Sequence, residues 1–291
     1  MKKLGIIYVL IAGSLWGAMG IFVRGLAQCG LSSLEICFVR VVTSTILMAG
    51  YFIVFDRKAL KVKLKDVWCF IGTGVFSLTF FGYCYFTTIQ MTSMSVAAVL
   101  LYTSPVFILI LSAILFKEKI TRKKVLCVVL AILGCACVSG IIGNSGGIST
   151  VGLLFGLGSG LGYGLYSIFG RFAIKRGYGA LTITFNSFLF SSIALMFITK
   201  PMQVIKKIST GGVDIIIFYV IGTAIVVTIL PYIFYTLGLT KIENSKAAVV
   251  ACIEPIMATV LGYVVFGEIL TAIEIVGVSL VLLAIILLAK E

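Results

Sequence analysis

Two ionisable residues stand inside long apolar segments of this sequence, and they are the first candidates for chemistry. Glu254 lies in the run SKAAVVACIEPIMATVLGYVVFGE, and Arg40 lies in the apolar run 33–55. A charged side chain costs on the order of 2.5 to 3.5 kcal/mol at the centre of a membrane helix, so such residues usually face a polar interior and often serve transport. Burial favours the neutral acid, which makes Glu254 a candidate proton carrier or a partner for an amine. A protonated glutamate with a structural hydrogen bond is the alternative.

Arg40 has two open interpretations, a contact to a solute or gate and a structural ion pair. Glu35 precedes it by five residues, a poor spacing for a pair on one helix, so a partner from another helix is expected. Arg24, Glu35 and Arg40 could form a polar cluster toward one membrane surface, with Arg24 and Glu35 as interfacial residues.

Two prolines interrupt apolar runs near their centres. Pro105 and Pro255 each remove one backbone donor and crowd the carbonyl four residues earlier. Exposed backbone at this depth is tolerated only against protein or a water-lined cavity, which predicts a cavity-lining kink at both positions. A kink that serves helix packing alone is the alternative. Ser104 precedes one proline where Glu254 precedes the other, and both belong to the predicted site.

Aromatic residues divide by depth in the apolar runs. A buried phenol or indole needs a polar partner, so the deeper residues are candidates for a pocket: Trp16, Tyr102 and Tyr163. Those toward the ends of the runs are expected to anchor at the membrane interface: Tyr83, Tyr85 and Tyr235.

The elements that must position these residues are membrane helices. The 291 residues are 61% hydrophobic and 11% charged, far from soluble usage. A span takes about 20 apolar residues, and long continuous runs favour helices over a β-barrel. The sequence therefore predicts an all-α integral membrane protein with ten transmembrane helices, at 4–22, 33–55, 67–89, 93–116, 123–142, 151–170, 178–199, 214–239, 244–266 and 273–289.

The formal charge of +13 is explained by orientation. With ten spans, 18 of the 23 basic residues fall on the side of the termini, four fall on the other side, and Arg40 lies within a span. Basic loops mark the cytoplasmic side, so both termini are expected there, in the cytoplasmic membrane. Only the segment 200–212 runs against this rule, and no nucleic-acid partner is expected.

The two halves of the chain repeat one another. At an offset of 150, Pro105, Glu118 and Thr121 align with Pro255, Glu268 and Thr271, and at an offset of 147, Gly17 and Arg24 align with Gly164 and Arg171. Five helices per copy invert the second copy in the membrane, an architecture that favours a central cavity and alternating access. We divide the chain into a first repeat at 1–142, a linker at 143–150 and a second repeat at 151–291.

Small residues line faces of the predicted first and sixth spans. Gly156, Gly160 and Gly164 share one face of their span, Gly158 and Gly162 share another, and Gly13 and Gly17 resemble them. Small residues at this spacing let helices approach closely. Packing within one chain is the main interpretation, with dimerisation and a thin wall beside a moving solute as alternatives, so a monomer is expected.

Several function classes are excluded or disfavoured. The chain has no histidine, no phosphate-binding loop and no buried aspartate pair, which argues against an enzyme and against ATP-driven transport by this chain alone. Its eight cysteines lack metal-ligand spacing and are expected to be reduced. We therefore expect no catalytic residue, no metal and no cofactor. An uncoupled facilitator or channel stays open as an alternative to a carrier.

The paired phrase, with its proline, aliphatic run and Phe-x-Glu after a first helix rich in glycine and aromatics, resembles the EamA-type carriers of the drug/metabolite transporter superfamily. The resemblance covers nearly the whole chain. It implies ten helices in inverted five-helix repeats, and a secondary transporter of amino acids or related metabolites in the direction of efflux. A proton or a counter-solute is a further expected partner. Ser104 in the place of Glu254 departs from a symmetric pattern.

Overall fold

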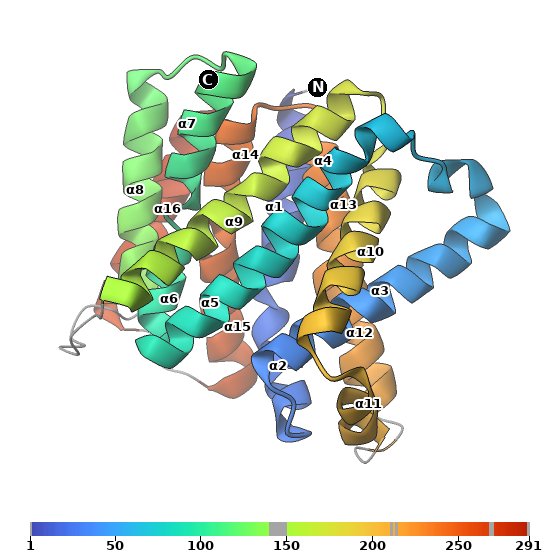
Figure 1. Cartoon of the computed structure of the whole chain (residues 1–291). Helices are drawn as coiled ribbons and strands as arrows, with labels where there is room; N and C mark the ends of the chain where they lie inside the picture. The colour runs from blue at the N-terminus through green and yellow to red at the C-terminus, as the bar shows by residue number, and fades with distance from the viewer. Residues whose placement is uncertain (1, 140–149, 210–211, 213–214, 268–270, 290–291) are drawn as a thin grey trace.

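The computed structural model describes residues 2–139, 150–209, 212, 215–267 and 271–289. Within these ranges the chain is a helical bundle without strands (Figure 1). The predicted linker at 143–150 lies outside the described residues except for Thr150, the first residue of α9.

The helices are broken more often than the sequence predicts. The first half contains α1 (Lys2–Gly17), α2 (Met19–Gln28), α3 (Ser33–Phe55), η1 (Arg57–Leu60), η2 (Leu64–Asp66), α4 (Val67–Ile71), η3 (Gly72–Thr79), α5 (Phe80–Met91), α6 (Met94–Leu101), α7 (Ser104–Phe116) and α8 (Arg122–Val138). The second half contains α9 (Thr150–Lys175), α10 (Ala180–Ile198), α11 (Pro201–Ser209), η4 (Ile215–Ile221), α12 (Gly222–Ala224), η5 (Ile225–Ile229), α13 (Leu230–Leu239), α14 (Asn244–Ala251), α15 (Ile253–Phe266) and α16 (Ala272–Ala289).

Nine helical segments of the described chain are long and apolar enough to cross a membrane. They match nine of the ten predicted spans, and the described part of the remaining one is α8, with 17 residues. The all-α membrane fold is thus confirmed, while the count of ten stays a prediction. The segment 200–212, expected only as a loop, contains the short amphipathic helix α11.

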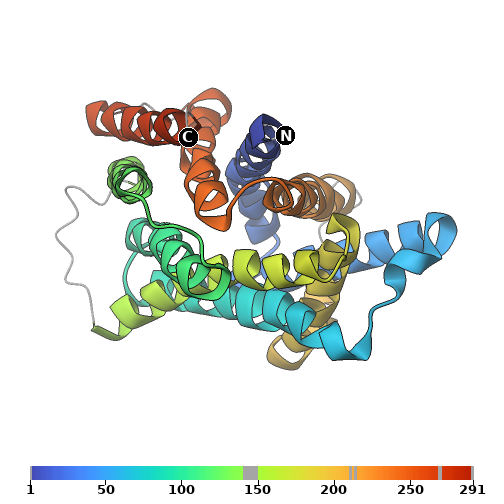
Figure 2. The same ribbon diagram turned by 90° about the horizontal axis from the view of Figure 1, so that it is seen from above.

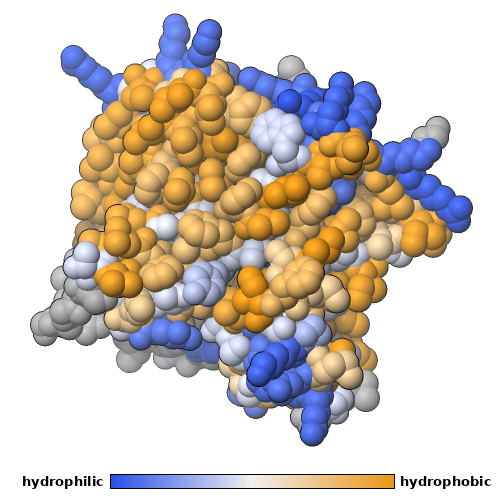
Figure 3. Space-filling model, in the orientation of Figure 1, coloured by the Kyte–Doolittle hydropathy of each residue, from blue (hydrophilic) through white to orange (hydrophobic). Residues whose placement is uncertain are grey.

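The surface has the pattern of a membrane protein. A broad hydrophobic band crosses the visible face, and hydrophilic groups gather above and below it (Figure 3). The first turn of α1 and the last turn of α16 lie at the same end of the bundle (Figure 1), which we name the terminal end; the opposite end is the distal end. The α7–α8 connection lies at the terminal end and carries Lys117 and Lys119.

The spans of Pro105 and Pro255, where the sequence predicts kinks, are both broken. The fourth span ends one helix at Leu101 and begins the next at Ser104, and the ninth span is interrupted at Cys252. The prolines stand in the first turn after each break, where a missing backbone donor costs little. As a result, α7 runs from its break to the terminal end, whereas α15 runs from its break to the distal end (Figure 1).

Glycines let the halves of the broken spans pack closely on long helices. A Cβ at Gly13 of α1 would lie 3.1 Å from the carbonyl oxygen of Ala251, and one at Gly160 of α9 would lie 3.3 Å from that of Leu101. These are the carbonyls that the two prolines leave without a helical donor. The glycine faces therefore serve packing within the chain, as the main interpretation predicts.

The same arrangement continues one turn further. Gly17 faces the carbonyl oxygen of Glu254, and Gly164 faces that of Ser104, at 2.8 and 3.6 Å from the added Cβ. The second glycine face of α9, Gly158 and Gly162, packs on α5. Figure 2 shows α5 and α9 side by side along one edge of the bundle.

Candidate functional site

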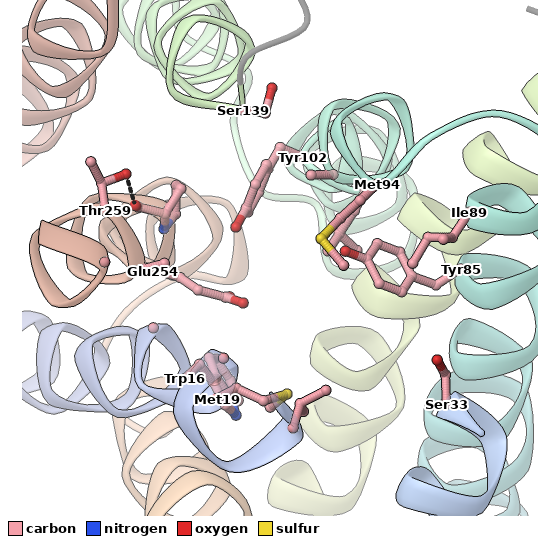
Figure 4. Close-up of a pocket in the computed structure, with 18 of the residues that line it drawn as sticks. Trp16, Met19, Ser33, Tyr85, Ile89, Met94, Tyr102, Ser139, Glu254 and Thr259 are labelled. Carbon is pink, nitrogen blue, oxygen red and sulfur yellow. Dashed lines mark hydrogen bonds between the residues drawn. The ribbon is translucent and has the colours of Figure 1, made fainter. Parts of the chain in front are cut away.

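A cavity of about 570 Å³ lies between the two broken spans. Its walls come from α1, α2 and α3 on one side, α5 and α6 on another, and α15 opposite α6. The lining reaches Met94 and Ser139, which lie where α6 begins and α8 ends, at the distal end (Figures 1 and 4). The cavity therefore extends from the middle of the bundle toward the distal end.

Glu254 is one of two glutamates that line the cavity, with Glu274. The break at Cys252 places it in the first turn of α15, where the helix dipole favours negative charge. The hydroxyl of Tyr163, on α9, donates to its Oε2 at 3.2 Å. In Figure 4 the side chains of Glu254 and Tyr102 project from opposite walls into the same open space. The acid thus has one protein hydrogen bond and room for a solute.

Arg40 is one of two arginines that line the cavity, with Arg24. Its side chain leaves the first half of α3, is only 7% exposed, and donates from Nη1 to the sulfur of Met19 at 3.0 Å. Its Nε has no hydrogen-bond partner among the described residues, and no described carboxylate lies within ion-pair distance of it. A buried, unsatisfied donor of this kind costs about 1–3 kcal/mol or more, so a solute anion is a suitable partner.

Aromatic rings close the cavity on the side of the terminal end. Trp16 lies 6.1, 5.1 and 5.3 Å, between ring centroids, from Tyr163, Tyr232 and Tyr235. The hydroxyl of Tyr235 shares a 2.7 Å hydrogen bond with Ser167, which satisfies its polar atom. The packed rings give this side of the cavity a largely aromatic wall.

Six of the eight residues predicted for the site line the cavity: Trp16, Arg40, Tyr102, Tyr163, Glu254 and Pro255. Ser104 and Pro105 do not, because both are buried in the first turn of α7. The reason is the direction of the helices after the breaks. Glu254 starts a helix that leads into the open half of the bundle, and Ser104 starts one that leads into the closed half.

The sequence interpretation misplaces two aromatics and misses others. Tyr85 lines the cavity and Tyr235 is 2% exposed, so neither is an interfacial anchor, while Tyr83 is 45% exposed. Further lining residues without a sequence signal are Met19, Phe81, Phe86 and Tyr232. Depth along a span does not reveal them, because the breaks and tilts of the helices decide which ends turn inward.

The expected cluster of Arg24, Glu35 and Arg40 does not form as one unit. Glu35 pairs with Lys207, at 2.7 Å, and caps α3 by accepting from the backbone of Ser32. Arg24 and Arg40 line the cavity instead. A partner from another helix is expected for Arg40, but the structure shows one for Glu35, which pairs with Lys207 of α11.

No group of three or more metal-ligating side chains occurs in the part of the chain that the structure describes. The cavity offers two carboxylates, of Glu254 and Glu274, and two guanidinium groups, of Arg24 and Arg40, together with aromatic, apolar and hydroxyl groups. This set suits the binding of an organic solute.

Comparison with known proteins agrees with the geometry. The model of the EamA-like transporter family matches residues 3–140 and again residues 150–290. The chain belongs to the EamA-like transporter family. The resemblance noted in the sequence is thereby confirmed, and the chain is a multi-pass membrane protein of a transporter family.

Some relatives of this EamA protein are similar over nearly their full length. Two uncharacterized transporters of Archaeoglobus fulgidus are each 26% identical to it, over 283 residues that cover 97% of this chain and 95% of the relative, and over 296 residues that cover both chains fully. A solved crystal structure superposes with a TM-score of 0.81 at 13% identity, covering 99% of this chain and 96% of the other. Family and relatives point to a transporter rather than an enzyme.

Proposed function

We propose that this protein is a secondary transporter that moves a small amphipathic or zwitterionic organic solute across the cytoplasmic membrane by alternating access, with efflux as the direction that the family favours. One observation carries the proposal. The cavity between the broken spans holds the carboxylate of Glu254 and the guanidinium of Arg40, which are not paired with each other, and it is closed toward one end of the bundle.

The charges of the cavity support the class of solute. Glu254 suits an amine and Arg40 suits a carboxylate, while Trp16 and Phe81 offer apolar surface. The cavity walls carry Arg24 and Arg40 against Glu254 and Glu274, so a polyanion would find no excess of fixed positive charge there. Glu254 is also the candidate for proton coupling, because a carboxyl group inside the membrane can bind and release a proton during transport.

Several features that inverted repeats would produce support the mechanism. The family model matches the two halves separately, and the glycine contacts of α1 with α15 recur between α9 and α7. The helices α8 and α16 contact each other reciprocally: a Cβ at Gly134 would lie 2.7 Å from the oxygen of Gly277, and one at Gly277 would lie 2.6 Å from that of Gly134. Reciprocal contacts are typical of elements beside a two-fold axis. Halves related in this way can adopt two similar states that open to opposite sides.

We assign the terminal end to the cytoplasm. The basic residues on the side of the termini outnumber those on the other side by 18 to four, and cytoplasmic loops carry such an excess. The cavity described above would then face outward.

The test is a counterflow screen in proteoliposomes with amino acids, nucleotide-like metabolites and organic cations, each with and without a proton gradient. A carrier saturates and is accelerated by unlabelled solute on the opposite side. Conductance without saturation would identify a channel instead and overturn the proposal. Glu254→Gln in the same vesicles is the reference for solute entry that does not use the cavity.

A further inference from the structure

The terminal ends of α7, α9 and α14 meet in a polar contact that the transport site does not use. The carboxylate of Glu118, just after α7, accepts from the backbone nitrogen of Asn244 at 2.9 Å. Its other oxygen accepts from the backbone nitrogen and the hydroxyl of Ser245, at 3.3 and 2.7 Å. A residue of the first half thus caps the first turn of a helix in the second half.

Two cationic side chains, of Arg171 and Lys124, add bonds to this contact. Arg171 of α9 donates from Nε to the side-chain oxygen of Asn244 at 2.8 Å, and also donates to the carbonyl of Ile242. Lys124, at the start of α8, pairs with Glu243 at 2.6 Å. Charge-assisted hydrogen bonds of this type are roughly twice as strong as neutral ones.

The contact lies where the bundle is closed. α7 packs against α14 at the terminal end, whereas α6 and α15 line opposite walls of the cavity toward the distal end. Ala247, Ala248, Val249 and Val250 of α14 are at most 5% exposed. A solute bound near Glu254 therefore cannot reach the terminal end unless α7 and α14 separate.

The capping of α14 differs from that of α6, its counterpart at an offset of 150. The hydroxyl of Ser93 caps α6 locally by accepting from the backbone nitrogen of Val96 at 3.2 Å. Glu243, at the corresponding position before α14, makes no such bond. The first turn of α14 thus takes its side-chain cap from Glu118, and it loses that cap whenever the two halves part.

We propose that Glu118 is the latch of a gate at the terminal end, formed by α7, α9 and α14, and that breaking its bonds to Asn244 and Ser245 opens the solute cavity to that end. This inference rests on the alternating access of the proposed function. The latch is polar and Glu118 is only half-buried, so water can replace its hydrogen bonds when the gate opens and the closure is reversible.

The test measures access to the two sides in the full-length protein, reconstituted in vesicles of known orientation. A cysteine is introduced either at Ala248, behind the latch, or at Ala98, on the cavity wall, and a membrane-impermeant maleimide is applied from the terminal or distal side, respectively. Site-resolved mass spectrometry separates these positions from the eight native cysteines. We expect Glu118→Gln to raise labelling at 248 by about tenfold and to lower labelling at 98, as the loss of a charge-assisted bond shifts the population between states.

Asp66→Asn is the matched control. Asp66 is another hydrogen-bonded carboxylate at the terminal end, with Arg176 at 2.8 Å and Tyr178 at 2.9 Å, and neither bond involves α14. It should leave both labelling rates unchanged. If Glu118→Gln changes neither rate, or raises both, Glu118 serves the fold alone and the latch is wrong. Labelling needs no solute, so a failed latch is distinguishable from a failed transport assay.

Discussion

The two broken spans use the same backbone device for different chemistry. In both, a proline follows the break and a glycine of a long helix packs against the freed carbonyl. After one break stands Ser104, 3% exposed and packed on α9; after the other stands Glu254, in the cavity and bonded to Tyr163 of α9. The break supplies space and a helix start, and the residue placed there supplies the function. If the halves are inverted repeats, as proposed, the state open to the terminal end would place Ser104 in a cavity and bury Glu254.

The largest expected effect tests the acid at the second break. Glu254→Gln keeps the shape but removes the charge, and we expect solute transport to fall by about 100-fold, because a buried charged partner contributes on the order of 1.5–3 kcal/mol. The measurement is the initial counterflow rate at equal amounts of reconstituted protein. Ser104→Ala is the control at the first break and should change the rate less than about twofold. Equal losses in both variants would contradict the assigned difference.

Alanine substitutions at the glycines beside the two breaks should lower the stability of the protein by different amounts. At Gly17 an added Cβ would lie 2.8 Å from backbone oxygen and 2.9 Å from backbone nitrogen, whereas at Gly164 the nearest atom is a side-chain carbon of Ile108 at 3.0 Å. Backbone cannot yield as a side chain can, so Gly17→Ala should cost about 1–3 kcal/mol and Gly164→Ala clearly less. Thermal unfolding in detergent compares them, with Gly50→Ala as a control in open space. A lower melting temperature for Gly164→Ala than for Gly17→Ala would show that the second break is the looser one.

Arg40 should select for solutes that carry a carboxylate. Arg40→Lys keeps the charge but loses the fork geometry, and we expect the half-saturating concentration of a zwitterionic solute to rise about tenfold with little change in maximal rate. The decarboxylated amine of the same solute is the matched control, since it would use Glu254 alone. If both solutes weaken equally, Arg40 acts on the fold of α3 rather than on the solute.

The smallest effect concerns access to the first break. A cysteine in place of Ser104 should resist an impermeant maleimide from the distal side and react slowly from the terminal side, because α7 runs toward that end. Adding Glu118→Gln should accelerate only the labelling from the terminal side. Rapid labelling from the distal side would place Ser104 in the present cavity and end the proposed exchange of environments.

Much of the site is visible in the sequence because it depends on short windows. Glu254, Arg40, Trp16, Tyr102 and Tyr163 stand out as polar or aromatic groups deep in apolar runs, and all five line the cavity. The same reasoning is wrong for Tyr85 and Tyr235, because both lie toward the ends of their spans and yet turn into the bundle. Position along one helix does not define its neighbours.

The sequence by itself determined that the chain crosses a membrane many times, where two spans break, and which helix faces are lined by glycine. These properties follow from local hydrophobicity and from backbone chemistry within about 20 residues. Only the tertiary structure decided which end of the bundle is closed, and that Glu118 caps a helix 126 residues away. The physical reason is that closure is a balance between contacts of distant segments, and the two breaks, alike in sequence, lead their helices toward opposite ends.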